Sequence, residues 1–112
     1  MNVEKLFPLP SGREAFRLGR EAFIPAKSGC YVLTTFGGVV LYIGLAKNLR
    51  KRMRNHLDTP EKVNLTPAGR AVLFYWLECA ELNKVERTWL NIHIENTGGM
   101  PVLNKVFSPT SV

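Results

Sequence analysis

Six polar side chains in the sequence are of types that could take part in phosphodiester hydrolysis. They are two tyrosines, an arginine, a histidine, a glutamate and an asparagine: Tyr31, Tyr42, Arg52, His56, Glu86 and Asn104. Such a reaction needs an activated water, neutralisation of the phosphate charge and stabilisation of the leaving oxygen. A guanidinium offers a phosphate planar, bidentate donors. One carboxylate suits Mg²⁺, which typically takes one or two carboxylates together with water and substrate oxygens.

Each of these residues also has an ordinary structural role open to it. The phenol of tyrosine has a reference pKa of about 10, so it serves as a base only where cationic or metal charge stabilises the phenolate. Otherwise Tyr31 and Tyr42 are common strand aromatics, and His56 is a helix-end histidine favoured by the helix dipole. Glu86 fits a helix-capping position and Asn104 a turn. The elements that carry these residues therefore decide whether they meet.

Both tyrosines fall on a predicted β-hairpin. The runs Cys30–Phe36 and Val39–Gly44 are rich in β-branched and aromatic residues, and only Gly37-Gly38 separates them. This pattern predicts a two-residue turn in which both glycines have positive φ. The resulting pairs are Phe36 with Val39, Leu33 with Tyr42, and Tyr31 with Gly44.

With this register the two tyrosines emerge on one face of the hairpin, about 7–8 Å apart at the backbone. The opposite face is almost entirely apolar, and it is predicted to be the core side of the hairpin. Its members are Cys30, Val32, Phe36, Val39, Leu41 and Ile43.

An amphipathic helix is predicted after the hairpin, since Leu45, Leu49, Met53 and Leu57 recur at every fourth residue. Arg52 and His56 are also four residues apart, so they lie one above the other beside the apolar stripe. The basic residues on the other faces of this segment are predicted to contact phosphates: Lys47, Arg50, Lys51 and Arg54.

Downstream, residues 58–70 read as a connecting loop in which Thr59-Pro60 can start a helical turn. Ala71–Cys79 reads as a third strand. A helix capped by Asn83 is predicted to run through Glu86 to near Glu95, and Thr97-Gly98-Gly99 ends it. An irregular segment then brings Asn104 back.

Residues 1–28 are predicted to form an N-terminal helical extension. Gly12–Phe16 recurs as Gly19–Phe23, which places Phe16 and Phe23 on one side of a helix between Ser11 and Pro25. The alternative is an arm that contacts DNA. That arm would use Arg13, Arg17 and Arg20.

Length and composition indicate one modest globular domain. The chain has 112 residues, a net charge of +6 and a pI near 9.7, so polyanions are plausible partners. Two cysteines in apolar runs favour reduced thiols in a cytoplasmic protein over a disulfide. No signal peptide and no membrane-spanning run is evident, so no membrane association is expected.

The order of these motifs resembles the GIY-YIG nuclease family, which includes the incision domain of a bacterial excision-repair nuclease and some homing and restriction endonucleases. The matching pieces cover residues from about 28 to 105. They are Gly29-Cys30-Tyr31, Tyr42-Ile43-Gly44, Asn48-Leu49-Arg50-Lys51-Arg52 with His56, Val85-Glu86 with Trp89-Leu90, and Pro101 with Asn104.

The resemblance implies an α/β fold, with a three-stranded antiparallel sheet flanked by helices over residues 29–106 and a frayed tail at 107–112. It also implies a metal-dependent DNA endonuclease in which water attacks the phosphodiester directly. Tyr31 is the usual general base and Tyr42 the alternative. His56 would assist the base or orient the phosphate, and Arg52 would bind the phosphate. Glu86 would hold Mg²⁺ or Mn²⁺, and Asn104 would maintain the geometry of the site.

Two departures from the family pattern bear on these roles. Leu45 stands where many members have a polar or basic residue, and the interval from Glu86 to Asn104 is about six residues longer than usual. A non-catalytic nucleic-acid-binding module on the same scaffold is the rival function. A homodimer or a partner protein would supply target specificity, since the chain has no room for a large recognition domain.

Overall fold

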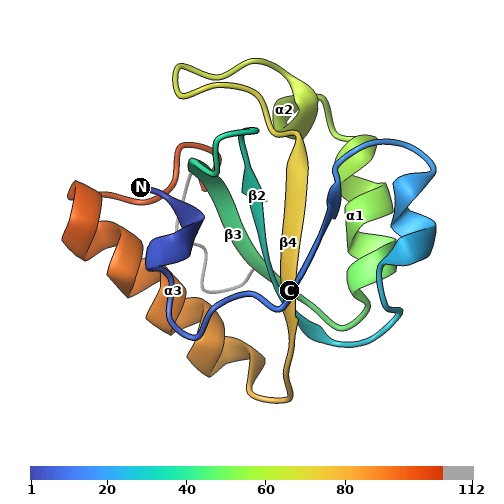
Figure 1. Ribbon diagram of the computed structural model, residues 1–112, viewed down its shortest axis with the longest axis horizontal. Coiled ribbons are helices and arrows are strands. Elements are labelled where there is room, and N and C mark those ends of the chain that lie inside the picture. The colour runs from blue at the N-terminus through green and yellow to red at the C-terminus, as the bar shows by residue number, and fades with distance from the viewer. Residues whose placement is uncertain (105–112) are drawn as a thin grey trace.

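The computed structural model describes residues 1–104 as a four-stranded antiparallel sheet between two helical layers (Figure 1). The strands are β1 (Gly12–Ala15), β2 (Gly29–Thr34), β3 (Val40–Ala46) and β4 (Leu73–Glu78). Their order across the sheet is β1-β4-β2-β3, so β3 is an edge strand. The α/β class predicted from the sequence is confirmed, but the sheet has four strands and not three.

Helices cover both faces of this sheet (Figure 1). α1 (Leu49–Leu57) and the short α2 (Pro60–Val63) lie on one side, and α3 (Leu82–Thr97) lies on the other. Two 3₁₀ helices, η1 (Val3–Lys5) and η2 (Arg20–Phe23), belong to the N-terminal segment. Across residues 1–104, no helix combines the length and apolar content needed to cross a bilayer.

The fourth strand comes from the segment in which a helix was predicted, so the prediction of a helix between Ser11 and Pro25 is wrong. β1 pairs with β4, and Gly12 lies opposite Trp76, so close that a Cβ on Gly12 would overlap the indole ring. Without β1 the strand β4 would be an unpaired sheet edge. Pairing satisfies its backbone groups, and Gly19 with a φ of 93° interrupts the local helical pattern.

The hairpin of β2 and β3 has the predicted pairs Leu33 with Tyr42 and Tyr31 with Gly44. Its turn differs from the two-residue turn predicted. The Gly38 N–H donates to the Thr35 carbonyl over 3.0 Å, and Gly38 has a φ of 90° while Gly37 does not have a positive φ. This is a three-residue loop closed by a left-handed glycine, a common alternative that adds a bulge.

The bulge changes which side chains face the core. The register shifts between Leu33 and Thr34, so Phe36 does not pair with Val39, and both of these residues are exposed. Leu41 joins the cluster on the tyrosine side of the sheet, and not the opposite cluster as predicted. The predicted core face of the hairpin is therefore correct only for Cys30, Val32 and Ile43.

The sheet has a hydrophobic core on each face, so the tyrosine face is not simply the outer one. The α1 side contains Phe16, Ile24, Tyr31, Leu33, Leu41, Ala46, Leu49, Met53, Ala71, Phe74 and Leu103. The α3 side contains Val3, Leu6, Cys30, Val32, Val40, Ile43, Trp89 and Leu90. The Tyr31 side chain therefore extends from β2 into the core beneath α1.

Two helix starts differ from the predicted ones. β3 continues through Leu45, and α1 begins after Asn48, whose side chain accepts from the Lys51 N–H over 3.0 Å. α3 begins at Leu82, so Asn83 lies inside the helix and is not its cap. The predicted end of α3 is confirmed, because Gly98 has a φ of 85° directly after Thr97. The predicted tail at 107–112 lies outside the described residues.

Candidate active site

A tyrosine and a histidine form a polar pair inside the α1 side of the core. The Tyr31 hydroxyl on β2 lies 2.5 Å from Nε2 of His56 on α1. Tyr31 has no solvent exposure and His56 is 8% exposed. The Tyr31 ring stacks on Phe74 of β4, with ring centroids 5.0 Å apart. The packing of three elements therefore fixes both side chains.

Burial and nearby charge decide which of the two carries the shared proton. Burial and, to a smaller extent, the charges of Lys62 and Arg52 together lower the pKa of His56 to about 3. Burial raises the pKa of Tyr31 well above its ordinary value, and Arg52 offsets part of this effect. At neutral pH we therefore assign a neutral imidazole whose Nε2 accepts the hydrogen bond from the Tyr31 hydroxyl.

Tyr42 and Arg52 complete a group of four predicted residues. The Tyr42 ring centroid is 5.9 Å from that of Tyr31 and 5.3 Å from that of His56. Both residues lie close enough to the Tyr31 hydroxyl to influence its pKa, which Tyr42 raises and the charge of Arg52 lowers. Tyr42 and Arg52 are half-buried, so solvent reaches the group through them and not through Tyr31.

Close packing around Tyr31 explains why position 44, two residues after Tyr42, is a glycine. It lies opposite Tyr31 on the neighbouring strand. A Cβ at Gly44 would lie 2.6 Å from the Tyr31 hydroxyl and 2.9 Å from Cε2 of Tyr42. Since Tyr31 is fully buried and cannot move aside, a side chain at Gly44 would displace the phenols from His56.

Asn104 lies at the edge of β3 and not in the tyrosine group. Its side-chain amide accepts from the Ile43 N–H over 2.9 Å and donates to the Ile43 carbonyl over 2.8 Å. The backbone of Leu103 also bonds to the Leu41 carbonyl. Asn104 thus pairs like a strand residue with the segment between Tyr42 and Gly44, and holds the edge that carries them.

Glu86 lies on the other side of the sheet. Glu86 lies near the thiol of Cys30 and influences the pKa of that thiol, and Cys30 belongs to the core under α3. Consecutive strand residues point to opposite faces, so Cys30 and its neighbour Tyr31 face away from each other. The sheet therefore separates the Glu86 carboxylate from the four-residue group, and a phosphate could contact both only round the edge of the sheet at β3.

The Glu86 carboxylate nevertheless fits a cation. It is half-buried, burial raises its pKa, and within residues 1–104 it accepts no hydrogen bond and forms no ion pair. That part of the chain contains no group of three or more His, Cys, Asp or Glu that could enclose a metal ion. One carboxylate completed by water and phosphate oxygens is a ligand set that Mg²⁺ accepts.

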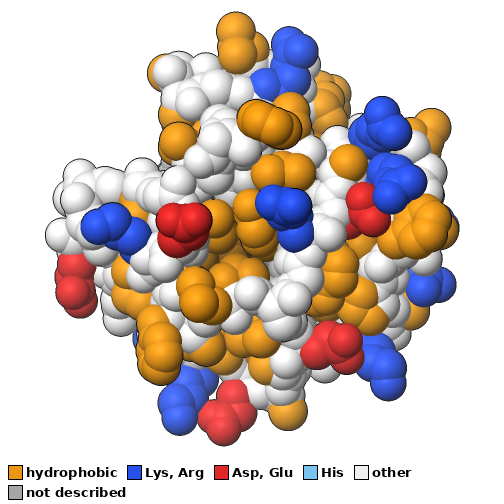
Figure 2. Space-filling view, in the orientation of Figure 1, with side chains coloured by type: hydrophobic (Ala, Val, Ile, Leu, Met, Phe, Trp, Pro, Cys, Tyr) orange, Lys and Arg blue, Asp and Glu red, His pale blue; other side chains and the backbone are white. Residues whose placement is uncertain are grey.

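The four cations predicted to contact phosphates divide into two pairs. Lys47 and Lys51 are exposed. Nε of Arg50 donates to the Ile24 carbonyl over 2.8 Å, and Arg54 lies 3.8 Å from the Glu21 carboxylate. Figure 2 shows Lys and Arg side chains along the side of the molecule where α1 lies, beside a largely apolar centre.

Lys62 lies beside Tyr42 and His56 and was not among the predicted site residues. Its Nζ lies 4.7 Å from the centroid of the Tyr42 ring, and its charge lowers the pKa of His56 more than that of Arg52 does. The residue falls in the segment predicted to be a connecting loop. The helical turn predicted after Thr59-Pro60 is confirmed as α2, which begins at the proline.

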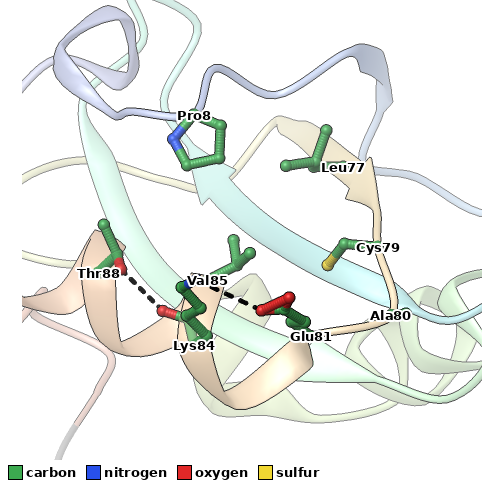
Figure 3. Close-up of a pocket in the computed structure, with 8 residues that line it drawn as sticks. All are labelled: Pro8, Leu77, Cys79, Ala80, Glu81, Lys84, Val85 and Thr88. Carbon is green, nitrogen blue, oxygen red and sulfur yellow. Dashed lines mark hydrogen bonds and ion pairs between the residues drawn. The ribbon is translucent and has the colours of Figure 1, made fainter.

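A separate pocket lies at the start of α3 (Figure 3). It has a volume of about 430 Å³ and mainly apolar walls formed by Pro8, Leu77, Cys79, Ala80, Glu81, Lys84, Val85 and Thr88. The Cys79 sulfur is 4.0 Å from that of Cys30, and both cysteines are free. None of the four grouped residues lines this pocket, so it is distinct from the candidate active site.

Comparison with known proteins gives relatives with one shared name. The chain is similar to UvrABC system protein C. It is 28% identical to that protein of Borrelia duttonii over 91 residues, which cover 70% of this chain. Over 38 and 49 residues it is 37% and 35% identical to those of Lactobacillus helveticus and Mesoplasma florum, covering 34% and 44% of this chain. No protein-family model matches it.

These relatives are much longer proteins. The chain spans 15% of the length of the Borrelia duttonii protein, 8% of the Mesoplasma florum protein and 6% of the Lactobacillus helveticus protein. The similarity therefore concerns one segment of each relative.

The depressed pKa of His56 predicts acid destabilisation. Between pH 6.5 and about 3 the unfolded chain binds a proton at His56 that the folded chain excludes. Stability is therefore full above pH 6.5 and falls with decreasing pH, by at most about 1.4 kcal/mol per pH unit from this group. The melting temperature, measured from pH 7 to pH 5, should fall more steeply for the wild type than for His56→Gln.

Glutamine at position 56 keeps an acceptor for the Tyr31 hydroxyl and cannot titrate in this range. His93 also has a pKa lowered by burial, but its contribution is common to both proteins. Parallel curves for the wild type and His56→Gln would contradict the assignment of a neutral, buried His56.

Proposed function

We propose that this chain is an endonuclease that hydrolyses a phosphodiester bond of DNA by direct attack of water. The observation that carries the proposal is the convergence of Tyr31, Tyr42, Arg52 and His56 within an otherwise apolar core. Burying such polar groups costs stability unless they are bonded to one another. In this group the two phenols and the neutral imidazole can transfer a proton, while the guanidinium binds an anion beside them.

The two tyrosines act in series in this proposal. Solvent reaches Tyr42, so Tyr42 takes the proton from the attacking water and passes its own proton to the Tyr31 hydroxyl. Tyr31 passes its proton to Nε2 of His56 across 2.5 Å. No free phenolate has to form, although burial raises the pKa of Tyr31. The oxygen of water bonds to phosphorus as the bond between phosphorus and the leaving oxygen breaks, and His56 becomes imidazolium. The departing alkoxide takes a proton from solvent water.

The phosphate itself prepares His56 for this role. Arg52 is the guanidinium beside the group and binds the phosphate oxygens, a geometry that bidentate donors favour. Bound negative charge opposes the two cations that help to lower the pKa of His56. The imidazole therefore becomes more basic when substrate is present. Mg²⁺ or Mn²⁺ held by Glu86 would supply charge that stabilises the developing negative charge on the phosphate.

Three further observations support DNA as the substrate. The chain carries a net charge of +6, cations follow the side on which α1 lies, and the similar proteins are named for the UvrABC system. The similarity to UvrABC system protein C of Borrelia duttonii covers 70% of the chain. We propose a role in DNA repair on this basis. A second copy or a partner protein would select the target.

The rival function is a nucleic-acid-binding module that does not cleave. It predicts binding without turnover, whereas the proposed enzyme predicts both. The test is incubation of the protein with supercoiled plasmid, branched DNA and damaged DNA, each with Mg²⁺, with Mn²⁺ and with EDTA. We expect strand cleavage with either metal and none with EDTA.

An Arg52→Ala preparation, purified identically, controls for contaminating nuclease. Cleavage by both preparations at the same rate would be due to a contaminant. Binding of all three substrates without cleavage under any condition would establish the binding module instead.

Binding should depend steeply on salt, because the proposed contacts are to phosphates. Each phosphate neutralised adds a slope of about −0.9 to the plot of log affinity against log salt concentration. We expect Lys47→Ala and Lys51→Ala each to reduce the magnitude of this slope by about 0.9, since both side chains are exposed. Fluorescence anisotropy with a labelled duplex in EDTA measures it.

Lys84→Ala is the matched control, because Lys84 lies on α3 and pairs with Glu81 over 3.5 Å. We expect the wild-type slope for this variant. An affinity independent of salt, or equal slopes for all four proteins, would contradict the phosphate contacts.

A further inference from the structure

The segment after α1 returns a lysine to the group formed by Tyr31, Tyr42, Arg52 and His56. The Thr59 N–H donates to the His56 carbonyl over 3.0 Å, and the Thr59 hydroxyl donates to the Asn55 carbonyl over 3.0 Å. The Lys62 N–H then donates to the Thr59 carbonyl over 2.9 Å. α2 is thus bonded, through Thr59, to the last turn of α1, which contains His56.

α2 is also packed and not merely tethered. Val63 packs against the core on the α1 side, and Pro60 occupies the start of the short helix. The position of the Lys62 backbone relative to His56 is therefore set by packing on one side and by hydrogen bonds on the other. The Lys62 side chain therefore starts from a fixed backbone position, and it is only half-exposed.

The ammonium of Lys62 borders two members of the group. Nζ lies 4.7 Å from the centroid of the Tyr42 ring, within the distance at which a cation and a ring attract each other. The ring of Tyr42 in turn lies edge-on to that of His56, at 5.3 Å between centroids. The groups that face His56 are therefore Tyr31 from β2, Tyr42 from β3, Arg52 from α1 and Lys62 from α2.

We propose that Lys62 is a second phosphate-binding cation of this site, contacting the scissile phosphate together with Arg52. This inference rests on the proposed function. Two cations from different helices border one imidazole and the one solvent-accessible phenol of the group, and this arrangement suits an anion better than it suits a packed core. A guanidinium provides fixed bidentate donors, whereas an ammonium on a flexible stem adjusts to the remaining oxygen.

The alternative is that Lys62 only stacks on Tyr42. A stacking role predicts that the loss of Lys62 affects the position of Tyr42 but not the number of phosphates neutralised. The two roles therefore separate in the salt dependence of binding. They also separate in the conservative variant, because arginine keeps the charge at this position.

The variants are Lys62→Met, Lys62→Gln and Lys62→Arg, with Lys84→Met on α3 as the matched control. The probe is a short DNA duplex in EDTA. We expect Lys62→Met and Lys62→Gln to reduce the magnitude of the log–log salt slope by about 0.9. Lys62→Arg and Lys84→Met should retain the wild-type slope. Under cleavage conditions kcat should fall at least tenfold for Lys62→Met and recover in part for Lys62→Arg.

NMR of the His56 imidazole distinguishes failure of this inference from failure of the proposed function. In the wild type, adding the duplex should shift the His56 signals and raise the pKa of His56, and in Lys62→Met the same amount of duplex should shift them less. A wild-type slope and wild-type shifts in Lys62→Met would overturn the role of Lys62 while leaving the function intact. No response of His56 in the wild type would overturn both.

Discussion

Tyr31→Phe and Arg52→Ala are expected to reduce cleavage of DNA by about 10²–10³-fold each, the usual effect of removing a group that stabilises charge in a transition state. The Tyr31 hydroxyl is hydrogen-bonded to His56, and Tyr42 and Arg52 both lie close enough to influence its pKa. Removing it interrupts the proton path, and removing Arg52 removes a phosphate ligand. The measurement is the rate of plasmid nicking under single-turnover conditions.

Burial of Tyr31 adds a cost in stability that the two variants do not share. The phenol is fully buried, so Tyr31→Phe leaves Nε2 of His56 without its partner. An unsatisfied buried polar group costs about 1–3 kcal/mol, so the melting temperature of Tyr31→Phe should fall. Arg52 is half-buried, and Arg52→Ala should change the melting temperature less.

A matched control separates stability from chemistry. Thr34 is also fully buried on β2, and its hydroxyl donates to the Thr35 carbonyl over 2.8 Å. Thr34→Val removes a buried hydrogen bond without touching the phenols, so it should destabilise the chain and leave cleavage at the wild-type rate. Full activity of Tyr31→Phe, measured below its melting temperature, would place the proton path elsewhere. Tyr42→Phe then shows whether Tyr42 alone is the base.

The sequence predicted the relation between the two tyrosines because it depends on local geometry. A strand alternates its faces, and a hairpin pairs its residues in order, so Tyr31 and Tyr42 had to share a face. The helical spacing of Arg52 and His56 was equally local. The burial of the phenols was not predictable in this way, because it depends on how α1 returns over the sheet.

The wrong predictions involve partners that are distant in the sequence. β1 is a strand because β4 offers an unpaired edge and because Gly12 fits against Trp76, and neither fact is visible within residues 1–28. Lys62 was not predicted as a site residue because its position beside Tyr42 depends on the hydrogen bonds that join α2 to α1. The sequence also could not indicate the side of the sheet on which Glu86 lies, because that depends on the face that α3 covers.

Glu86→Gln is expected to abolish metal-dependent cleavage, whereas Glu95→Gln should cleave at the wild-type rate. Both glutamates lie on α3, nine residues apart, a rotation of about 900° that puts them on opposite sides of the helix. Glu95 is exposed, and Glu86 is half-buried beside Cys30 at the sheet. Single-turnover cleavage with Mg²⁺ and with Mn²⁺ measures the effect, for which about 10²–10³-fold is expected.

Stability should move in the opposite direction to activity. Burial raises the pKa of Glu86, so folding disfavours its charged form. That contribution to stability is present at acid pH and is lost as the pH rises through the folded pKa of Glu86. At pH 7 the wild type therefore holds a desolvated carboxylate, and Glu86→Gln removes this penalty. The melting temperature of Glu86→Gln at pH 7 should be higher than that of the wild type, and that of Glu95→Gln unchanged.

A rise in stability with a loss of activity is the signature expected of a group kept for function at a cost to the fold. It also excludes misfolding as the reason for an inactive Glu86→Gln. Mn²⁺ provides a readout that does not depend on cleavage, because its paramagnetism broadens NMR signals of nearby residues. Broadening should centre on Glu86 and Cys30 in the wild type and disappear in Glu86→Gln. If Glu86→Gln is active and Glu95→Gln is inactive, the metal ligand is Glu95 and the proposed role of Glu86 is wrong. Glu86 would then be only a buried acid beside Cys30.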